Sequence, residues 1–378
     1  MTKLEGPDLI AAAQQFIPEG RVADLREYGS GNVNDTFLVK VANDAVPPRA
    51  GEARFILQRL NTAVFRQPHL VMANLDAVTS HVQRRLEREP LGPGRRFELP
   101  RVLPARDGGN LLEDARGSCW RALSFIEGAE TFDIIKDRDH AREAGYALGL
   151  FHRLLADLPP RSLADTHPGF HVTPGYLEKY DEILAAAGGP ASAEVDYCRN
   201  FIAARRDFAC VLEEAQRKGK LQPRVMHGDP KINNVMLDSV SGQAVSLVDL
   251  DTVKPGLVHY DIGDCLRSCC NPLGEETEAW EEVRFEPDLG RAILEGYLAL
   301  ARDFLTASDI AFLYDAIRLI AFELGLRFFK DFLAGNVYFK ARHREHNLAR
   351  ALVQFRLTES IEAQAAAIKA MIRDLIPR

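Results

Sequence analysis

The first third of the chain alternates short apolar runs with clusters of turn-forming residues, the pattern of β-strands joined by tight loops. Residues 9–16 precede these runs with the spacing of a short helix, which Pro18 ends. The sequence therefore predicts a small sheet here. Its strands are expected at residues 22–28, 36–41, 54–60, 97–102 and 119–126. Hairpin turns are expected at residues 106–110 and 116–118.

One helix interrupts this strand pattern. Residues 69–86 carry apolar side chains at intervals of about one helical turn. We expect Leu70, Ala73, Ala77 and Val78 to share one face of this helix.

The pattern changes from strand-like to helical after residue 126. Residues 141–155 form the strongest amphipathic helix, and the chain is mainly helical again from residue 289 to its end. We therefore expect an α+β protein with two lobes. They are a small β-rich N-terminal lobe, residues 1–126, and a larger, mainly helical C-terminal lobe, residues 127–378.

Composition excludes several classes of partner. The 378 residues are 46% hydrophobic and 27% charged, and the net charge of −7 provides no basic surface for nucleic acid or anionic membranes. No run approaches the roughly 18 apolar residues of a membrane span, and the first residues lack the apolar core of a signal peptide. The six cysteines form no Cys-x-x-Cys pair, so we expect reduced packing residues in a cytoplasmic protein.

The most informative segment is His227-Gly-Asp-Pro-Lys-Ile-Asn-Asn234, followed by Asp249 at the end of an apolar run. It has the His-x-Asp-x-x-x-x-Asn spacing of the kinase catalytic loop. Phosphoryl transfer from ATP needs a carboxylate to accept the proton of the attacking hydroxyl, and an Asn and a second Asp to hold Mg²⁺. Asp229 is the predicted general base. Asn234 and Asp249 are the predicted Mg²⁺ ligands, because hard oxygen atoms suit this ion.

Other polar residues near this segment are assigned supporting roles. His227 is expected to brace the loop by hydrogen bonding, and Asn233 to belong to the loop structure. Lys231 is expected either to reach the γ-phosphate of ATP or to be a solvated loop lysine. If the preceding strand continues, Asp251 would face the same way as Asp249 and contact the site.

Two carboxylates, Asp261 and Asp264, lie just before Cys265 in the next predicted helix. Their separation of three residues is that of an N-cap residue and its N3 partner. We therefore expect them to cap this helix rather than to take part in the chemistry.

A glycine-rich segment, residues 29–35, joins the first two predicted strands. In a kinase-like lobe such a loop covers the ATP phosphates with its backbone amides. Ser30, Gly31 and Asn32 are therefore the predicted phosphate contacts.

The strand lysine of kinases is missing from residues 55–60. No glutamate stands in the expected register of the following helix either. Gln58 or Arg59 is the expected substitute, and Arg59 could bind the α/β-phosphates as a cation.

A charged residue stands on an apolar face in the C-terminal lobe. Arg327 falls beside Ile320 and Leu324, where an unpaired charge is costly to bury. Glu323, one turn earlier, is one possible partner. The other possibility, which we favour, is that Arg327 faces a polar substrate pocket.

These motifs together resemble the aminoglycoside phosphotransferase and choline kinase superfamily, and more closely its N-acetylhexosamine 1-kinases. The superfamily resemblance extends over most of the chain and rests on His227, Asp229, Asn234 and Asp249. The closer resemblance, to the N-acetylhexosamine 1-kinases, rests on longer stretches. These stretches are residues 28–36, 57–61, 248–252, 322–331, 335–340 and 346–347. The most specific of them are those near the C-terminus.

The resemblance implies a fold and a reaction. The fold would be protein-kinase-like, and the enzyme would use ATP and Mg²⁺ to convert an N-acetylhexosamine into its 1-phosphate. Asp229 would engage the anomeric hydroxyl, Arg327 and Tyr338 would hold the sugar, and adenine would lie near Phe125 and Ile126. The chain departs from the closest relatives at two positions, which leaves the exact sugar open. They are Asn32, where histidine is expected, and Ala73, where glutamate is expected.

Two alternatives remain. An aminoglycoside or choline kinase would bind a cation, which residues 310–350 disfavour with seven Lys or Arg against four Asp or Glu. A nucleotide-binding pseudokinase would explain the missing lysine and glutamate, but not the complete set of Asp229, Asn234 and Asp249. The protein is expected to act on a small molecule, without nucleic acid or membrane, as a monomer or homodimer.

Overall fold

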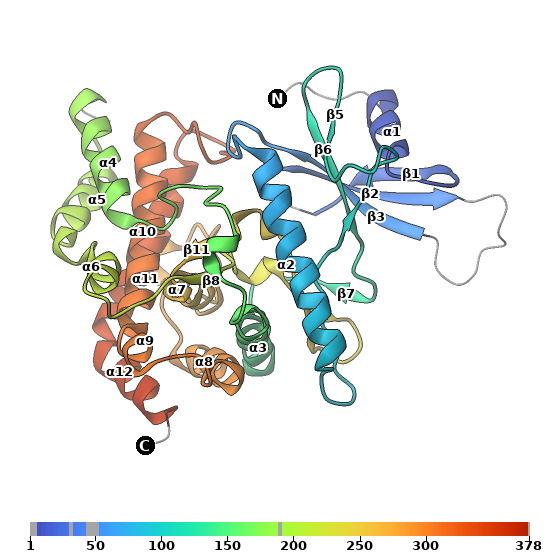
Figure 1. The fold of residues 1–378 in the computed structure, drawn as a ribbon. Coiled ribbons are helices and arrows are strands. Elements are labelled where there is room, and N and C mark those ends of the chain that lie inside the picture. Colours follow the sequence, from blue (N-terminus) through green and yellow to red (C-terminus); the bar gives the residue numbers. More distant parts are fainter. Residues whose placement is uncertain (1–5, 30–32, 43–52, 188–190, 377–378) are drawn as a thin grey trace. The chain divides into compact units, whose positions relative to one another are not determined.

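The computed structural model describes residues 6–29, 33–42, 53–187 and 191–376 (Figure 1). The chain divides into two compact units, each described by itself. The first comprises residues 1–90 and 98–127, and the second residues 91–97 and 128–378. The α+β class predicted from the sequence is confirmed, because the first unit carries an antiparallel sheet and the second is mainly helical.

The first unit is built on a sheet with strand order β1-β2-β3-β6-β4, in which β5 also pairs with β6. Apolar residues alternate along these strands, and one face packs against α1 around Phe37, Leu57 and Trp120. The strands predicted at 22–28, 36–41, 54–60 and 119–126 are confirmed. The elements are α1 (Gly6–Gln14), β1 (Arg21–Glu27), β2 (Asp35–Ala42), β3 (Ala53–Leu60), α2 (Pro68–Arg88), β4 (Val102–Leu103), β5 (Leu112–Glu113) and β6 (Cys119–Ser124).

Two sequence predictions in this unit are wrong. The strand predicted at 97–102 is reduced to β4, because Pro100 has no amide hydrogen to donate to a neighbouring strand. The helix predicted at 69–86 exists as α2, but Leu70 and Ala73 are exposed. Val78 is buried as predicted, and the rest of the buried face includes Val71, Leu75 and Val82.

The second unit is mainly helical, with two small sheets, β10-β9-β7 and β11-β8. Its helices are α3 (Arg138–Leu155), α4 (Thr173–Ala187), α5 (Ala193–Ala203), α6 (Val211–Arg217), α7 (Val258–Cys269), α8 (Pro287–Ala301), α9 (Ala307–Ala311), α10 (Leu313–Leu333), α11 (His346–Ala363) and α12 (Ala365–Asp374). Its strands are β7 (Ala129–Glu130), β8 (Arg224–Met226), β9 (Val235–Asp238), β10 (Ala244–Leu247) and β11 (Lys254–Gly256). Short 3₁₀ helices are η1 (Pro160–Ser162), η2 (Arg206–Phe208), η3 (Ile232–Asn234), η4 (Leu250–Thr252) and η5 (Trp280–Glu282).

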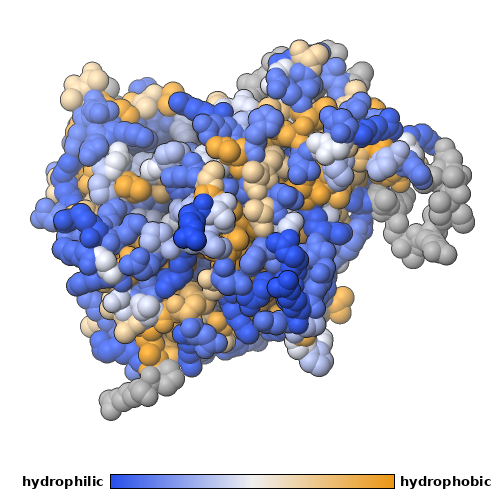
Figure 2. Space-filling view, viewed as in Figure 1, coloured by the Kyte–Doolittle hydropathy of each residue, from blue (hydrophilic) through white to orange (hydrophobic). Residues whose placement is uncertain are grey.

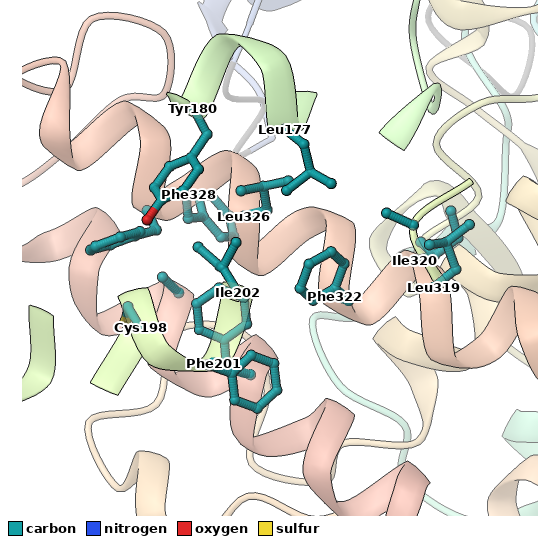
Figure 3. Close-up of a cluster of buried hydrophobic side chains, with 14 of the residues drawn as sticks. Leu177, Tyr180, Cys198, Phe201, Ile202, Leu319, Ile320, Phe322, Leu326 and Phe328 are labelled. Atoms are coloured by element: carbon teal, nitrogen blue, oxygen red, sulfur yellow. The ribbon is translucent and has the colours of Figure 1, made fainter. Parts of the chain in front are cut away.

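Helix α10 forms the centre of this unit. Leu319, Phe322 and Leu326 on α10 are buried in a core to which α4, α5 and α11 contribute (Figure 3). The rings of Phe201 and Phe355 stack within it at a centroid distance of 4.6 Å. Aromatic contacts of this kind hold the helices that carry the site.

Glycines permit a close contact between α3 and α8. A Cβ atom on Gly145 would overlap the carbonyl oxygen of Ile293, and one on Gly149 would lie 2.6 Å from that of Tyr297. The two helix backbones therefore approach more closely than larger residues would allow.

Surface and cysteine properties agree with the composition. On the face in Figure 2, polar residues predominate over the helical unit and apolar ones occupy small areas. In the described ranges, no helix is long and apolar enough to cross a membrane. All six cysteines are free thiols.

The close helix contact generates a stability prediction. Gly145→Ala is expected to lower the free energy of unfolding by about 1–3 kcal/mol, because the added methyl group meets the α8 backbone. Gly175→Ala on α4 is the matched control, since no atom lies within 4 Å of its added Cβ. It should be neutral or raise stability by up to about 1 kcal/mol. Denaturant unfolding measures both, and equal losses would show that the helix contact is not the cause.

Candidate active site

The segment with the kinase-like spacing forms a loop between β8 and β9. The β8 strand pairs with β11, with Val225 opposite Pro255, which fixes where the loop begins. Gly228 has a φ of +89°, and a Cβ there would lie 2.8 Å from the Cβ of Thr252. Only glycine fits this turn without strain, so the backbone itself directs the chain into Asp229.

The buried carboxylate of Asp261 holds this loop. The backbone amides of His227 and Gly228 donate to its two oxygens at 2.6 and 2.7 Å. Burial opposes its ionisation, but hydrogen bonding to His152 and the nearby charges outweigh burial and keep the pKa of Asp261 below its usual value. His152 lies 2.8 Å from the same carboxylate and 3.0 Å from the hydroxyl of Tyr297. A charged Asp261 therefore anchors the loop to α7.

This arrangement corrects the prediction that Asp261 and Asp264 cap a helix. Helix α7 already begins at Val258, so both carboxylates lie inside it. Asp264 instead accepts a hydrogen bond from Arg267 at 2.9 Å. Burial raises the pKa of Asp264, and the negative charge of Asp229 raises it further.

His227 braces the loop, as predicted. The amide of Asp229 donates to its Nδ1 at 3.2 Å, and its Nε2 lies 3.1 Å from the carbonyl oxygen of Val248. Burial lowers the pKa of His227, so the ring is neutral, with Nδ1 as acceptor and Nε2–H as donor. The imidazole thus links the loop of Asp229 to the segment that leads into Asp249.

Asp229, Lys231 and Asn234 converge on one point. Lys231 Nζ lies 2.7 Å from Asp229 Oδ2, and the Asn234 amide donates to the same oxygen at 3.2 Å. Asn234 also donates to the backbone carbonyl of Asp229 at 2.7 Å. Desolvation opposes the charge of Lys231, but Asp229 and Asp249 outweigh it and raise its pKa. Lys231 is therefore a cation paired within the site, and not a freely solvated lysine.

Asp249 has a left-handed backbone, with φ 62° and ψ 54°. A non-glycine residue in this conformation is strained, and such strain is concentrated at functional sites. The expectation that Asp251 faces the same way is wrong, because β10 ends at Leu247 and Asp251 lies in the 3₁₀ turn η4. The side chain of Asp249 is exposed, whereas Asp251 is buried.

The donor set fits Mg²⁺. Because the Asn234 amide nitrogen donates to Asp229, its oxygen remains as a neutral ligand, and Asp249 supplies a charged oxygen. In the described ranges, no group of three or more His, Cys, Asp or Glu could hold a metal. The proposed magnesium ligands are one amide and one carboxylate, so they do not amount to a group of that size. Phosphate and water would complete the shell of the ion.

Arg327 on α10 lies inside an aromatic box. Its guanidinium carbon is 5.0 Å from the ring centre of Phe170, 5.2 Å from Tyr176 and 5.5 Å from Phe339. Glu323 Oε1, the alternative partner, is 3.8 Å away, too far for a hydrogen bond. Desolvation opposes the charge of Arg327, but the pKa is raised by the neighbouring tyrosines, Glu323 and Asp229. The guanidinium thus lies within electrostatic range of Asp229.

Tyr338 belongs to a loop that Asp331 organises. The buried carboxylate of Asp331 accepts hydrogen bonds from the backbone amides of Val337, Tyr338 and Phe339 at 2.8–3.1 Å. Phe339 packs on Phe328 of α10, while the residue Tyr338 is 43% exposed. Tyr338 therefore has an accessible ring on a fixed backbone.

Apart from Lys231, the predicted nucleotide contacts belong to the first unit. Ser30, Gly31 and Asn32 are outside the described residues. Arg59 is paired with Asp35 across β2 and β3, so its cation is held by a neighbouring carboxylate. Phe125 lies edge-on to Tyr28 at 5.8 Å, and Ile126 is buried.

Sequence analysis did not single out a second cation in this unit. Arg121 on β6 is 1% exposed and donates two hydrogen bonds to Gln58 at 2.7 and 2.9 Å. The available signal was an arginine inside an otherwise apolar strand. Gln58 is therefore a partner of Arg121 and not a substitute for the missing lysine.

Comparison with known proteins defines the class. The model of the phosphotransferase enzyme family matches residues 24–302, which is more than half of the chain. The protein is thus a phosphotransferase of the class that acts on hydroxyl groups of small molecules. It belongs to the phosphotransferase enzyme family that includes the aminoglycoside phosphotransferases.

Solved structures support the kinase-like fold. A microcompartment-associated aminopropanol kinase is 18% identical, with a TM-score of 0.64 over 97% of this chain and 99% of that one. Choline kinase from Cryptosporidium parvum is 14% identical, with a TM-score of 0.59 over 97% and 98%. A spectinomycin phosphotransferase with bound ADP and spectinomycin is 10% identical, with a TM-score of 0.55 over 96% and 99%. At these identities the likeness establishes the fold, which confirms the predicted protein-kinase-like class.

The geometry generates a prediction for Asp229. Asp229→Asn is expected to lower kcat for phosphoryl transfer by about 10²–10⁴, because an amide cannot accept the proton of the hydroxyl. Asp196→Asn, an exposed carboxylate on α5, is the control and should leave turnover unchanged. Steady-state kinetics measure both. Near-normal turnover of Asp229→Asn would refute the assignment of the base.

Proposed function

We propose that the protein transfers the γ-phosphoryl group of ATP to the anomeric hydroxyl of an N-acetylhexosamine. The observation that carries the choice of a neutral acceptor is Arg327, a buried cation within electrostatic range of Asp229. The resemblance of residues 322–331 and 335–340 to N-acetylhexosamine 1-kinases supports the sugar. The family membership supports the phosphotransfer itself.

Asp229 would act on the acceptor. Its Oδ2 atom already contacts Lys231 and Asn234, so Oδ1 is the oxygen that would accept the proton of the hydroxyl. Lys231 would lie close to the transferred phosphoryl group as a cation. Asn234 and Asp249 would hold Mg²⁺, which neutralises charge on the ATP phosphates when bound.

The aromatic box argues against a cationic acceptor. Choline and aminoalcohols are recognised by aromatic rings and carboxylates, through cation–π and ionic attraction. In this chain the rings of Phe170, Tyr176 and Phe339 already surround the guanidinium of Arg327. A second cation at this place would be repelled, whereas the hydroxyl and acetamido oxygens of a sugar would accept hydrogen bonds from Arg327. Tyr338 would add an accessible ring for the sugar face.

The nucleotide would be held by the first unit. Ser30, Gly31 and Asn32 are proposed to contact the phosphates, and Phe125 and Ile126 the adenine. Arg59, held by Asp35, is proposed to take the place of the strand lysine that other kinases pair with a glutamate. The ADP in the spectinomycin phosphotransferase structure supports nucleotide use by this fold.

A substrate panel tests the proposed reaction. With Mg·ATP, we expect turnover of N-acetylglucosamine or N-acetylgalactosamine to exceed that of choline, ethanolamine and aminoglycosides. The product should be acid-labile, because the phosphate is attached to the anomeric carbon, and its ³¹P signal should disappear after mild hydrolysis. Turnover of an amine with an acid-stable product would identify the alternative, an aminoalcohol or aminoglycoside kinase. Nucleotide binding without turnover would favour a regulatory protein.

Arg327 provides a direct test of acceptor recognition. Arg327→Met keeps an unbranched stem but removes the charged guanidinium group, and is expected to raise KM for the sugar about 10–100-fold with little change in KM for ATP. Lys369→Met, which removes a cation over the ring of Tyr314, is the matched control and should change neither constant. An unchanged sugar KM in Arg327→Met would contradict the proposed pocket.

A further inference from the structure

One buried histidine of the second unit contacts the catalytic loop at the carbonyl group of Gly228, the residue whose amide is bound by Asp261. His171 is 3% exposed and has a left-handed backbone, with φ 62°. Its Nε2 lies 2.8 Å from the carbonyl oxygen of Gly228, and its Nδ1 lies 2.9 Å from Glu323 Oε1. The histidine thus connects the residue directly before Asp229 to α10.

The contacts of His171 determine its protonation state. A backbone carbonyl is only an acceptor, so Nε2 must carry a proton. Glu323 accepts a second hydrogen bond, from Thr173 at 2.8 Å, and the pKa of Glu323 is lowered despite burial by His171 and Arg327. Independently of the charge on the ring, Glu323 faces the cation of Arg327 at 3.8 Å and accepts from Thr173, so it is the ionised acceptor here and Nδ1 must donate to it as well. An imidazole that donates from both nitrogens is an imidazolium cation.

The charges around His171 agree with this assignment. From α10, Glu323 favours the cation and Arg327 opposes it, and from α7, Asp264 favours it. Tyr260 of α7 stacks on the ring at 5.5 Å and donates to Glu213 of α6, a further carboxylate. His167 on the adjoining loop adds no positive charge at neutral pH, because burial lowers its pKa to about 4. Burial disfavours the His171 cation, but the attraction of Glu323 outweighs burial. The pKa of His171 is therefore raised from its usual value of 6.5.

We propose that His171 is a cationic positioning residue that couples the acceptor pocket to the catalytic loop. Arg327, Glu323 and His171 form a row that ends on the carbonyl of Gly228, so a ligand on Arg327 acts on the backbone that orients Asp229. This inference rests on the proposed phosphoryl transfer by Asp229, and does not require that the acceptor is a sugar.

The protonation state of His171 determines how kcat should change with pH. Below its raised pKa, His171 carries both protons and makes both hydrogen bonds. As pH rises through that pKa, one proton leaves, and the link to either Gly228 or Glu323 is lost. We therefore expect kcat to fall, with the loss of one proton, as pH rises through the raised pKa of His171, while KM for ATP stays constant.

The first measurement is independent of activity. Ring-nitrogen NMR of the full chain, with labelled histidine, should show His171 doubly protonated at pH 7. His140 and His259 are internal references and should be neutral at that pH, because burial lowers the pKa of each. A neutral His171 ring at pH 7 would overturn the proposal even if no acceptor were ever found. A cationic ring without turnover would instead count against the proposed function.

Two variants test the coupling, with whichever acceptor gives the highest turnover. His171→Asn suits the left-handed backbone but cannot become a cation, so kcat should fall about 10–100-fold and its decline with rising pH should disappear. Glu323→Gln should move that decline to lower pH, because it removes the charge that holds the second proton. A purely structural histidine would leave the pH profile of Glu323→Gln unchanged, which is the outcome that refutes the coupling. If either variant does not fold, the NMR measurement still decides the protonation state.

Discussion

The candidate site depends on one carboxylate that binds two consecutive backbone amides. Asp261 accepts hydrogen bonds from His227 and Gly228, and thereby determines the direction in which the chain enters Asp229. Both amides are buried, so without this carboxylate each would lose its partner at a cost of about 1–3 kcal/mol. Helix α7, which carries Asp261, lies tightly against α10, where a Cβ on Gly263 would be 2.6 Å from the carbonyl oxygen of Ala316. The position of the loop is therefore a consequence of helix packing.

The buried charges of the second unit are mostly matched at hydrogen-bond distance. The buried Arg267 contacts Asp264, and the half-buried Lys231 contacts Asp229 in the same way. For Arg327, the nearest carboxylate among the described residues is that of Glu323, at 3.8 Å, which is beyond hydrogen-bond distance. Aromatic rings cover the remainder of the guanidinium group. A buried cation without a close acceptor is costly to a folded protein, and a ligand that supplies oxygen atoms offsets this cost. This imbalance supports a neutral or oxygen-rich acceptor over an amine.

Local patterns predicted the elements well where local physics decides them. Four strands and the helices α2 and α3 were predicted within a few residues, because alternation and helical spacing reflect which side chains are buried. The errors concern direction. Leu70 and Ala73 were assigned to the buried face of α2 but are exposed, and Asp261 was assigned as the N-cap of a helix whose N-cap is Leu257, four residues earlier. For α2 the sequence did contain a signal for the correct face, because Val71, Leu75, Val78 and Val82 recur at helical spacing.

The sequence by itself determined the spacing of Asp229, Asn234 and Asp249. This spacing is a local property, because the number of residues between two groups limits how far apart they can lie. The sequence also determined the α+β class and the presence of a cation on an apolar face of α10. Only the tertiary structure decided which partners these groups meet. His171 bridges Gly228 and Glu323 over separations of 57 and 152 residues. Contacts between such distant residues arise from the packing of whole helices, and no local pattern encodes them.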